Sequence, residues 1–597
     1  GGVVVKQRLV NQRLAPVAME TRGTVAEMRK ADKTLTVWSS SQNPHLLRNI
    51  LCAQVGLPQH QVRVIVPEVG GGFGSKINIY PEEPLVAFAA MKTGHPVKWI
   101  EDRSENMAVT IHGRDQVDHV EIAATRDGKI TGLKIYGISD LGAYCQLLTD
   151  AIMIALGFPV SAGAYDIPNV HLSADLVFTN KAPTDAYRGA GRPEATYIIE
   201  RMMDLTAREL GMDPAEIRRR NFIQPDQFPH KSAAGAVYDS GNYEPALDKA
   251  LSLVGYQELR AEQARRRAAG NGKLMGIGIS SYIEACGIGP KGSLPVGLFE
   301  SARVRIEHSG TVLVYTGSSP HGQGEETTFS QIVADEFGIP IENILIMHGD
   351  TDSTPEGRGT YGSRTTAVGG TALFVAAQRL KEKMKTIAAH LLEASASDVV
   401  FEDGKFSVAG SPQKSLTFNE IAMAANFSNT LHPSMEPGLE TTAFWEPTGN
   451  TFPFGTHICV VEVDKDTGAA EITRFVAVDD CGRQLNPMLV EGQVHGGLAQ
   501  GIGQAMTEEV IYGDDGQLLT ATLMDYAMPL APELPSYETA STVTLTPINP
   551  LGVKGVGEAG TIGSTSAVAN AIADALGVAH IETPFTSEKL WKVIHQQ

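Results

Sequence analysis

The chain has 597 residues, of which 42% are hydrophobic and 20% are charged, and its formal net charge at pH 7 is −19. This length is too great for one hydrophobic core, so several domain-sized units are expected. The acidic balance argues against nucleic acid or an anionic membrane surface as a partner. Five scattered cysteines without a CxxC pair argue against a disulfide framework, an iron–sulfur cluster or a structural zinc site in this chain, and favour a cytoplasmic location.

No segment of the sequence predicts a transmembrane helix or a secretory signal. The longest apolar run, Ala151 to Val160, is too short to cross a bilayer. The chain begins with Gly1 and Gly2 in place of an initiator methionine and continues directly into a strand-like run. We therefore expect further polypeptide upstream of this sequence.

The first part of the chain predicts a strand, a loop, a helix and a second strand. Thr34 to Trp38 alternates like a strand, a polar loop with Gln42 follows, and His45 to Val55 is helical. A strand over Gln61 to Val66 leads to the glycine-rich loop Val69 to Lys76, VGGGFGSK. Its spacing fails both the P-loop and the GxGxxG fingerprint. The loop therefore indicates either close approach to a flat or anionic ligand or a tight structural turn.

The same order of elements returns later in the chain. A strand, a glutamine loop, a helix, a strand and a glycine-containing loop are predicted at Thr311 to Thr316, Gln323, Glu325 to Phe337, Ile344 to Met347 and Gly359 to Arg364. The glutamines Gln42 and Gln323 stand 281 positions apart. This spacing predicts a remote internal duplication, in which a ligand between two halves meets one glutamine and one glycine-rich loop from each.

Other local signals predict hairpins, helices and a boundary. Glycine turns predict hairpins at residues 126–128, 309–310 and 467–468. Helices are expected over Pro193 to Leu210, with Gly211 as its stop, over Thr366 to Glu393 and over Thr565 to Leu576. The polar, basic stretch Arg260 to Gly272 is the candidate linker between the halves. Strands mixed with helices throughout predict an α+β fold with mixed sheets.

Two loops carry side chains that suit a polar ligand. Asp185 to Ala195, DAYRGAGRPEA, contains Arg188 and Arg192, which could bind a phosphate or a carboxylate or pair with local acids. In HGQG, Gln323 could offer a donor and an acceptor to a heterocycle, or it could be a satisfied buried amide. His321 beside it is more often structural than catalytic.

Two later stretches are rich in glycine. Glu491 to Gly503, with Gln493 and Gln500, has poor helix propensity, so its small residues predict tight packing against a partner or a ligand. In Leu551 to Ser564, LGVKGVGEAGTIGS, Glu558 could be a general base or an acid at a helix start. A serine nucleophile elbow, HExxH and Walker A are all absent from the sequence. Amides, glycines and a lone glutamate without these motifs indicate a protein that binds a polar organic cofactor, and the cofactor then carries the chemistry.

Taken together and in this order, GGGFGSK, AYRGAGRPEA, HGQG, GTYGSR, EGQVHGG and GVGEAG resemble the large subunit of the molybdenum hydroxylase family, which includes xanthine dehydrogenase and aldehyde oxidase. The resemblance is greatest to the carbon monoxide dehydrogenase branch. It implies two elongated molybdopterin-binding domains, residues 1–265 and 266–597, and a small α/β domain upstream of this chain. The cofactor would be molybdopterin as its cytosine dinucleotide, with molybdenum held by the pterin dithiolene sulfurs and by no side chain.

The resemblance also assigns roles to individual residues. It implies that Glu558 is the catalytic base and that Gln42 lies beside the metal. The implied cofactor-binding residues are Gly72, Phe73, Gly74, Arg188, Gly322, Gln323, Gly324, Gly362, Ser363, Thr365, Gln493 and Gly557.

The function implied is that of the catalytic molybdenum subunit of a multi-subunit hydroxylase that takes oxygen from water. Electrons would leave through an iron–sulfur (2Fe-2S) small subunit and an FAD-binding medium subunit, in a cytoplasmic dimer of heterotrimers. Two alternatives are a non-catalytic scaffold that binds the dinucleotide cofactor and carbon monoxide oxidation by a rearranged site.

Departures from the family pattern concern the substrate. Carbon monoxide oxidation in this family uses a cysteine after the AYR arginine to hold copper, and Gly189 stands there in this chain. Xanthine-oxidising relatives carry a glutamate where this chain has Ile77, and tend to carry an aromatic residue where it has Ala190. These differences argue against carbon monoxide and purines and favour an aldehyde or an N-heteroaromatic substrate.

Overall fold

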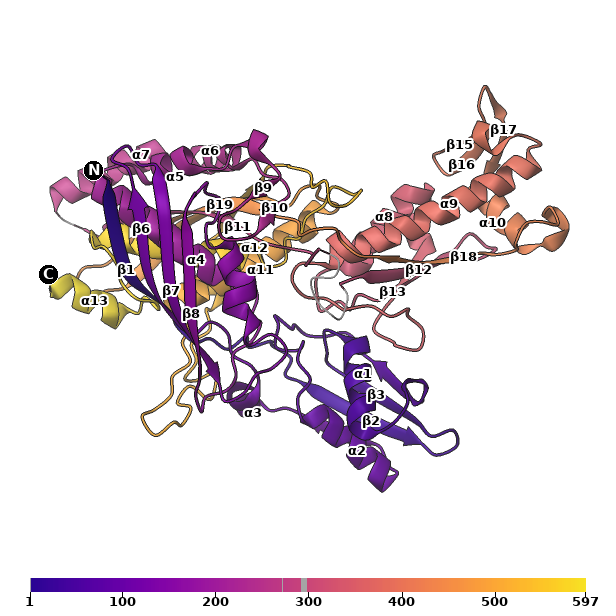
Figure 1. Ribbon diagram of the computed structural model, residues 1–597, viewed down its shortest axis with the longest axis horizontal. Helices are drawn as coiled ribbons and strands as arrows, with labels where there is room; N and C mark the ends of the chain where they lie inside the picture. The colour runs from indigo at the N-terminus through magenta and orange to yellow at the C-terminus, as the bar shows by residue number, and fades with distance from the viewer. Residues whose placement is uncertain (1, 271, 291–297, 597) are drawn as a thin grey trace.

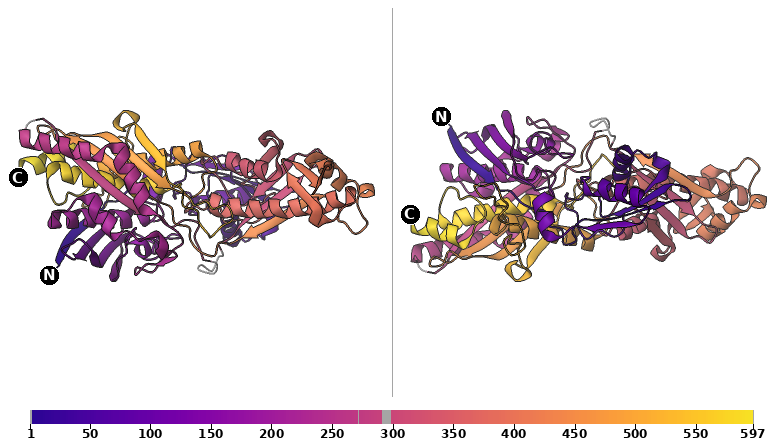
Figure 2. Two further views of the ribbon diagram at one scale, coloured as in Figure 1. Left: turned by 90° about the horizontal axis from the view of Figure 1, so that it is seen from above. Right: turned by 90° about the horizontal axis from the view of Figure 1, so that it is seen from below.

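The computed structural model describes residues 2–270, 272–290 and 298–596. The molecule is elongated, with a large body that holds both chain ends and two smaller lobes beside it (Figure 1). Viewed from above and below, the lobe at the far end of the long axis is the one built from the middle of the chain (Figure 2). Within the described ranges, every helix is too short or too polar to cross a membrane.

The body contains two four-stranded sheets with the same topology. In each sheet the first three strands pair antiparallel and the fourth pairs parallel with the third. The first sheet, in spatial order, consists of β1 (Val3–Asn11), β6 (Gln116–Ala124), β7 (Ile130–Gly142) and β8 (Val170–Phe178). The second consists of β11 (Leu274–Ile283), β19 (Phe454–Val463), β20 (Ala470–Asp480) and β21 (Tyr537–Ser541). A long helix follows the last strand of each sheet, α4 (Arg192–Leu210) and α12 (Ala559–Leu576).

The two lobes repeat one another in the same way. Each has a four-stranded sheet in which one pair of strands is parallel and two are antiparallel, and each sheet carries two helices. The first lobe contains β4 (Val62–Ile65), β3 (Thr34–Ser39), β2 (Gly23–Arg29), β5 (Val97–Ile100), α1 (Pro44–Val55) and α2 (Glu82–Thr93). The second contains β14 (Ile344–Met347), β13 (Val312–Thr316), β12 (Glu300–Ile306), β18 (Leu439–Trp445), α8 (Glu325–Phe337) and α9 (Thr371–Leu391).

The internal duplication predicted from the glutamine loops is therefore confirmed, and it extends through both sheets of each half. The second half differs by insertions: three short strands and α10 between α9 and β18, and α11 between β20 and β21. The remaining elements are α3 (Arg103–Val109), α5 (Pro214–Asn221), β9 (His230–Lys231), β10 (Val237–Tyr238), α6 (Tyr243–Val254), α7 (Tyr256–Ala269), β15 (Val399–Glu402), β16 (Lys405–Val408), β17 (Ser411–Thr417), α10 (Phe418–Asn426), α11 (Pro487–Met506) and α13 (Ser587–His595).

The body is a shared core and not two adjacent cores. One hydrophobic cluster contains Leu9 and Ile199 from the first half together with Ile277 and Ile572 from the second. Strand β11 is buried along almost its whole length, as expected for a strand covered on both faces. The boundary between residues 265 and 266 stays a prediction, but the two sequence halves fold around each other in the body.

The stretch predicted to be a polar linker is mostly helix α7, and that prediction was wrong. Arg260 on α7 pairs with Asp574 at 2.8 Å, and the buried Gln263 donates to the carbonyl of Met275 at 2.9 Å. The basic residues of the stretch thus hold α7 against the second half. Asn271 lies outside the described residues.

Two of the predicted helices begin at other residues than the sequence predicted. Helix α12 begins at Ala559 and not at Thr565, so Gly560 and Gly563 lie inside it. A Cβ on Gly560 would meet the carbonyl oxygen of Val494 at 2.5 Å, so this glycine permits the close packing of α11 on α12, whereas a Cβ on Gly563 would meet His457 Nδ1 at 2.5 Å. The helix expected over Thr366 to Glu393 is a π-helical turn, Thr365–Gly370, followed by α9.

Candidate active site

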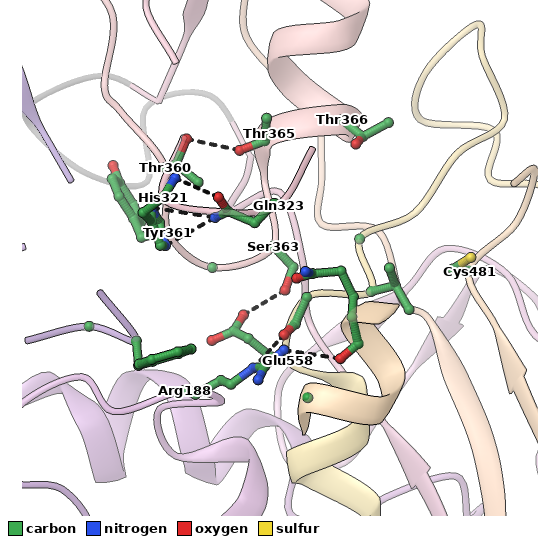
Figure 3. Close-up of a pocket in the computed structure, with 18 of the residues that line it drawn as sticks. Arg188, His321, Gln323, Thr360, Tyr361, Ser363, Thr365, Thr366, Cys481 and Glu558 are labelled. Carbon is green, nitrogen blue, oxygen red and sulfur yellow. Dashed lines mark hydrogen bonds between the residues drawn. The ribbon is translucent and has the colours of Figure 1, made fainter. Parts of the chain in front are cut away.

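The loops of both halves enclose a cavity of about 440 Å³ where the body meets the two lobes (Figure 3). Twelve of the fourteen residues singled out in the sequence line it, and the structure thus brings them together: Gln42, Phe73, Gly74, Arg188, Gly322, Gln323, Gly362, Ser363, Thr365, Gln493, Gly557 and Glu558. Gly72 and Gly324 lie behind the wall, where a Cβ would meet Gln42 Oε1 at 2.4 Å or Leu489 Cδ2 at 2.6 Å. The roles of these residues are still predictions.

Glu558 lies at the start of α12, and three groups from other parts of the chain hold its carboxylate. Oε1 accepts from the backbone N–H of Gly189 at 2.7 Å. Oε2 accepts from Ser363 Oγ at 2.8 Å and from Arg192 Nη2 at 3.0 Å. Burial acts to raise the pKa of Glu558, but the Arg192 guanidinium and these hydrogen bonds outweigh it and lower the pKa below its ordinary value. The carboxylate is therefore ionised and fixed in position near neutral pH.

Arg188 donates hydrogen bonds to the residue before Glu558 and to α11. Its Nε donates to the carbonyl of Gly557 at 2.6 Å, Nη1 donates to Gln500 Oε1 at 2.9 Å, and Nη2 donates to the carbonyl of Gln493 at 3.1 Å. Of the two arginines predicted to bind an anion, Arg192 does bind a carboxylate, although that carboxylate is distant in sequence. Arg188 instead ties the loop before α4 to α11 and to the residue before Glu558.

The two glutamines of the duplication are held differently. Gln42 Oε1 accepts from the N–H of Gly74 at 3.1 Å, and its Nε2 donates to the carbonyl of Thr360 at 2.9 Å. This bond joins the loops of the two halves and leaves one N–H of the amide uncommitted. Gln323 Oε1 accepts from the backbone N–H of His321 at 2.7 Å, and its Nε2 lies 3.0 Å from His321 Nε2. Burial lowers the pKa of His321 to about 4, so this imidazole is neutral near pH 7.

Backbone strain is concentrated around the cavity. Ten non-glycine residues among those described have positive φ, and four of them line the cavity. These four are Phe73 at 54°, Ala190 at 40°, Ile288 at 40° and Ser363 at 52°. Such conformations cost free energy and persist where the surroundings hold them, which is typical of ligand and active sites.

Sequence reasoning missed Glu284 and Lys554. Glu284 follows β11, is fully buried and lies within hydrogen-bonding reach of Glu558. Lys554 is buried at the cavity wall, and its Nζ has no hydrogen-bond acceptor in the described part of the chain. Glu284 stands in none of the stretches singled out in the sequence. The nearest signal was the position of Lys554 in the Glu558 loop.

The cavity suits a large anionic cofactor with flat polar parts. Lys554 has an unused donor, and Arg483 lines the same wall, so both could meet phosphate groups. A Cβ on Gly322 or Gly492 would project into open space, which leaves room for a ligand against bare backbone. Side chains that could share a metal ion gather, within the described ranges, at Glu68, Glu326 and His348, outside the cavity wall. A metal in the cavity would therefore have to arrive with its own ligands.

Comparison with known proteins agrees with this chemistry. Two family models, each described as a molybdopterin cofactor-binding domain, match residues 2–222 and 249–535. The carbon monoxide dehydrogenase large chain of Afipia carboxidovorans is 43% identical over 100% of this chain and 75% of its own length. The nicotine 6-hydroxylase large subunit of Paenarthrobacter nicotinovorans is 36% identical over 97% of this chain and 72% of its own. The solved structure of quinoline 2-oxidoreductase from Pseudomonas putida 86 is 39% identical, with a TM-score of 0.95, over 100% of this chain and 76% of that one.

The chain belongs to the molybdenum hydroxylase family, as a large subunit of the branch that includes the carbon monoxide dehydrogenase large chain. It is a molybdenum-containing oxidoreductase and carries the molybdopterin site of its enzyme.

Proposed function

We propose that this subunit hydroxylates an N-heteroaromatic ring, with water as the source of oxygen. The observation that supports this most is the position of Glu558, an ionised carboxylate on a cavity whose nearby wall is apolar. Ile77 and Ala190 form a small hydrophobic cluster there, and Leu148, Leu156 and Tyr361 pack against it. Such a wall suits a flat apolar ring and offers no charged group for a purine. Relatives named for nicotine and quinoline share 36% and 39% of their residues with this chain.

The backbone at Gly189 argues against copper-dependent carbon monoxide oxidation. Gly189 has φ of +101°, and a Cβ there would lie 2.3 Å from Pro193 Cγ. A cysteine at this position would be strained and would clash with the first turn of α4. The N–H of Gly189 already binds Glu558, so the position serves the carboxylate.

The residues of this chain would bind and orient the cofactor, and Glu558 would accept a proton. Molybdopterin, when bound, supplies a molybdenum centre that takes two electrons from the substrate and passes on oxygen derived from water. Gln42, Gln323, Ser363, Thr365 and Gln493 would hold it, with Lys554 and Arg483 toward its phosphates. Glu558 would accept a proton at its carboxylate as a general base, since it is ionised and its contacts leave it facing the cavity. The apolar wall would exclude bulk water from the ring.

We infer that the pterin is the cytosine dinucleotide and that 2Fe-2S and FAD subunits carry the electrons away in a cytoplasmic dimer of heterotrimers. The scattered cysteines of this chain support separate electron carriers, because buried Cys286, Cys459 and Cys481 form no cluster motif.

Metal analysis and a substrate panel on the purified complex test the proposal. Molybdenum should be present without copper, and quinoline or a pyridine should reduce the enzyme faster than benzaldehyde, xanthine or carbon monoxide. In water enriched in oxygen-18 the hydroxylated product should carry one labelled atom. Faster turnover of benzaldehyde would replace the ring substrate by an aldehyde. A loaded complex that oxidises none of them would favour the scaffold alternative.

A further inference from the structure

The carboxyl group of Glu284 has no ordinary partner. It is fully buried, and neither of its oxygens accepts a hydrogen bond from an N–H or a hydroxyl in the described residues. Ser363 lies nearby, but its hydroxyl donates to Glu558 Oε2 at 2.8 Å. Cys286 offers only a thiol, which is a weak donor. An ionised Glu284 would therefore be a buried charge without a donor, which is costly.

The charges around Glu284 also oppose its ionisation. No cationic nitrogen of the described residues lies within 4 Å of it, whereas Arg192 is paired with Glu558 at 3.0 Å. Two carboxylates beside one guanidinium repel each other when both are charged. Burial, and next the charge of Glu558, raise the pKa of Glu284, while Arg192 opposes them. The titratable and charged groups that face it are Glu558, Arg192, Arg188, Cys286 and Tyr282.

We propose that Glu284 is a positioning residue that stays protonated and donates its O–H to the carboxylate of Glu558. The neutral acid then completes a set of four donors around the base, with Arg192, Ser363 and the N–H of Gly189. The pair holds one proton and one negative charge, so Glu558 stays ionised although only 12% of its side chain is exposed. This inference rests on the proposed role of Glu558 as the base.

A double-mutant cycle on the holo complex tests the shared proton without measuring turnover. A raised pKa stabilises the fold below the ordinary value of the group, and this stabilisation is lost as pH rises through the raised value. The melting temperature of Glu284→Gln minus that of the wild type should therefore increase between pH 5 and pH 8. In the Glu558→Gln background the increase should shrink, because the neighbouring charge that holds the proton is gone.

Asp118 provides the matched control. It is fully buried on β6, burial raises its pKa to about 7, and it does not line the cavity. Asp118→Asn should show the same pH-dependent gain in melting temperature, unaffected by Glu558→Gln. If the Glu284→Gln gain is absent, or equally unaffected by Glu558→Gln, then Glu284 does not share a proton with Glu558.

Kinetic measurements on two variants of Glu284 then distinguish the effect of its hydrogen-bond donor from the effect of its side-chain size. Glu284→Gln keeps an N–H donor and should keep kcat/KM within a few-fold of the wild type. Glu284→Leu removes the donor, so the acid limb of kcat/KM should move up by about one pH unit, as loss of a hydrogen bond to a charged group predicts. An unchanged acid limb in Glu284→Leu, with molybdenum content retained, would overturn the positioning role. Near-normal turnover of Glu558→Gln would instead refute the proposed base and leave the melting result standing.

Discussion

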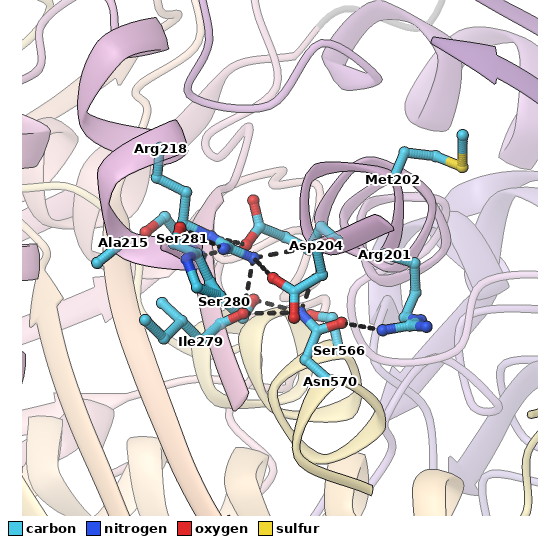
Figure 4. A network of polar contacts seen from close by, with 12 residues as sticks. Arg201, Met202, Asp204, Ala215, Arg218, Ile279, Ser280, Ser281, Ser566 and Asn570 are labelled. Atoms are coloured by element: carbon cyan, nitrogen blue, oxygen red, sulfur yellow. Dashed lines mark hydrogen bonds and ion pairs between the residues drawn. The ribbon is translucent and has the colours of Figure 1, made fainter. Parts of the chain in front are cut away.

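Two clusters of carboxylates lie in the body and differ in how completely they are paired with cations. On one side of α4, Glu200 accepts from Arg218 Nε and from the N–H of Ser281, each at 2.8 Å, and from the hydroxyl of Tyr165. Arg218 also pairs with Asp204 at 2.8 Å, and both lie in a network between α4, α5, β11 and α12 (Figure 4). Both carboxylates there are paired with the guanidinium of Arg218.

The cavity cluster is held less completely. Glu558 has three donors but keeps 12% of its side chain exposed, and Glu284 beside it has none. Both clusters shift pKa values, because burial perturbs any ionisable group. A perturbed pKa alone therefore does not distinguish a structural network from a site. Two other features distinguish the site from the structural network: Glu558 is open toward the cavity, and the neighbouring Glu284 has no hydrogen-bond donor among the described residues.

Substitution of Glu558, the proposed base, should give the largest effect. Glu558→Gln keeps the shape and the contact with Gly189 but cannot accept a proton, so turnover should fall by about 10²–10⁴-fold. Molybdenum content should change little, since glutamine keeps the size and shape of the side chain in the cavity wall. Stopped-flow reduction by substrate together with metal analysis checks this. Loss of molybdenum in step with activity would show a cofactor-binding role and not a base.

Substitution in the other cluster should give the opposite result. Arg218→Met leaves Glu200 and Asp204 buried without their cation, which costs about 3–5 kcal/mol. Soluble yield and melting temperature should fall, while activity per molybdenum in the surviving protein stays near normal. Arg219→Met, one residue on, is the control, because Arg219 pairs with the exposed Glu244 and such pairs contribute at most about 1 kcal/mol. Equal losses in both variants would contradict the contrast between the clusters.

Much of the fold and cavity could be predicted from the sequence because glycine spacing and strand alternation are local signals. The match of Gln42 to Gln323 identified the duplication, and twelve predicted residues do line one cavity. The linker prediction at Arg260 failed because its partner, Asp574, comes from the far end of the chain. Glu284 was missed for a similar reason. Its proposed role follows from the lack of hydrogen-bond donors around its carboxyl group in the described residues, and no spacing in the sequence encodes this.

The smallest effect is expected from loss of the single hydrogen bond between Ser363 and Glu558. Glu558 must be ionised to accept a proton, and Arg192 and its hydrogen bonds hold its pKa below the ordinary value, so the acid limb of kcat/KM should lie below the ordinary range of a glutamate carboxyl in the wild type. Ser363→Ala removes the donor 2.8 Å from Oε2 and should raise this limb by up to about one pH unit. Measuring both proteins with the same substrate cancels the titration of the substrate itself. Thr206→Val is the control, since its buried hydroxyl on α4 donates only to Met202 at 2.7 Å and its loss should not move the limb. If Ser363→Ala leaves the limb in place, the ionisation of Glu558 depends on Arg192 and its other donors, and the serine hydroxyl serves the cofactor alone.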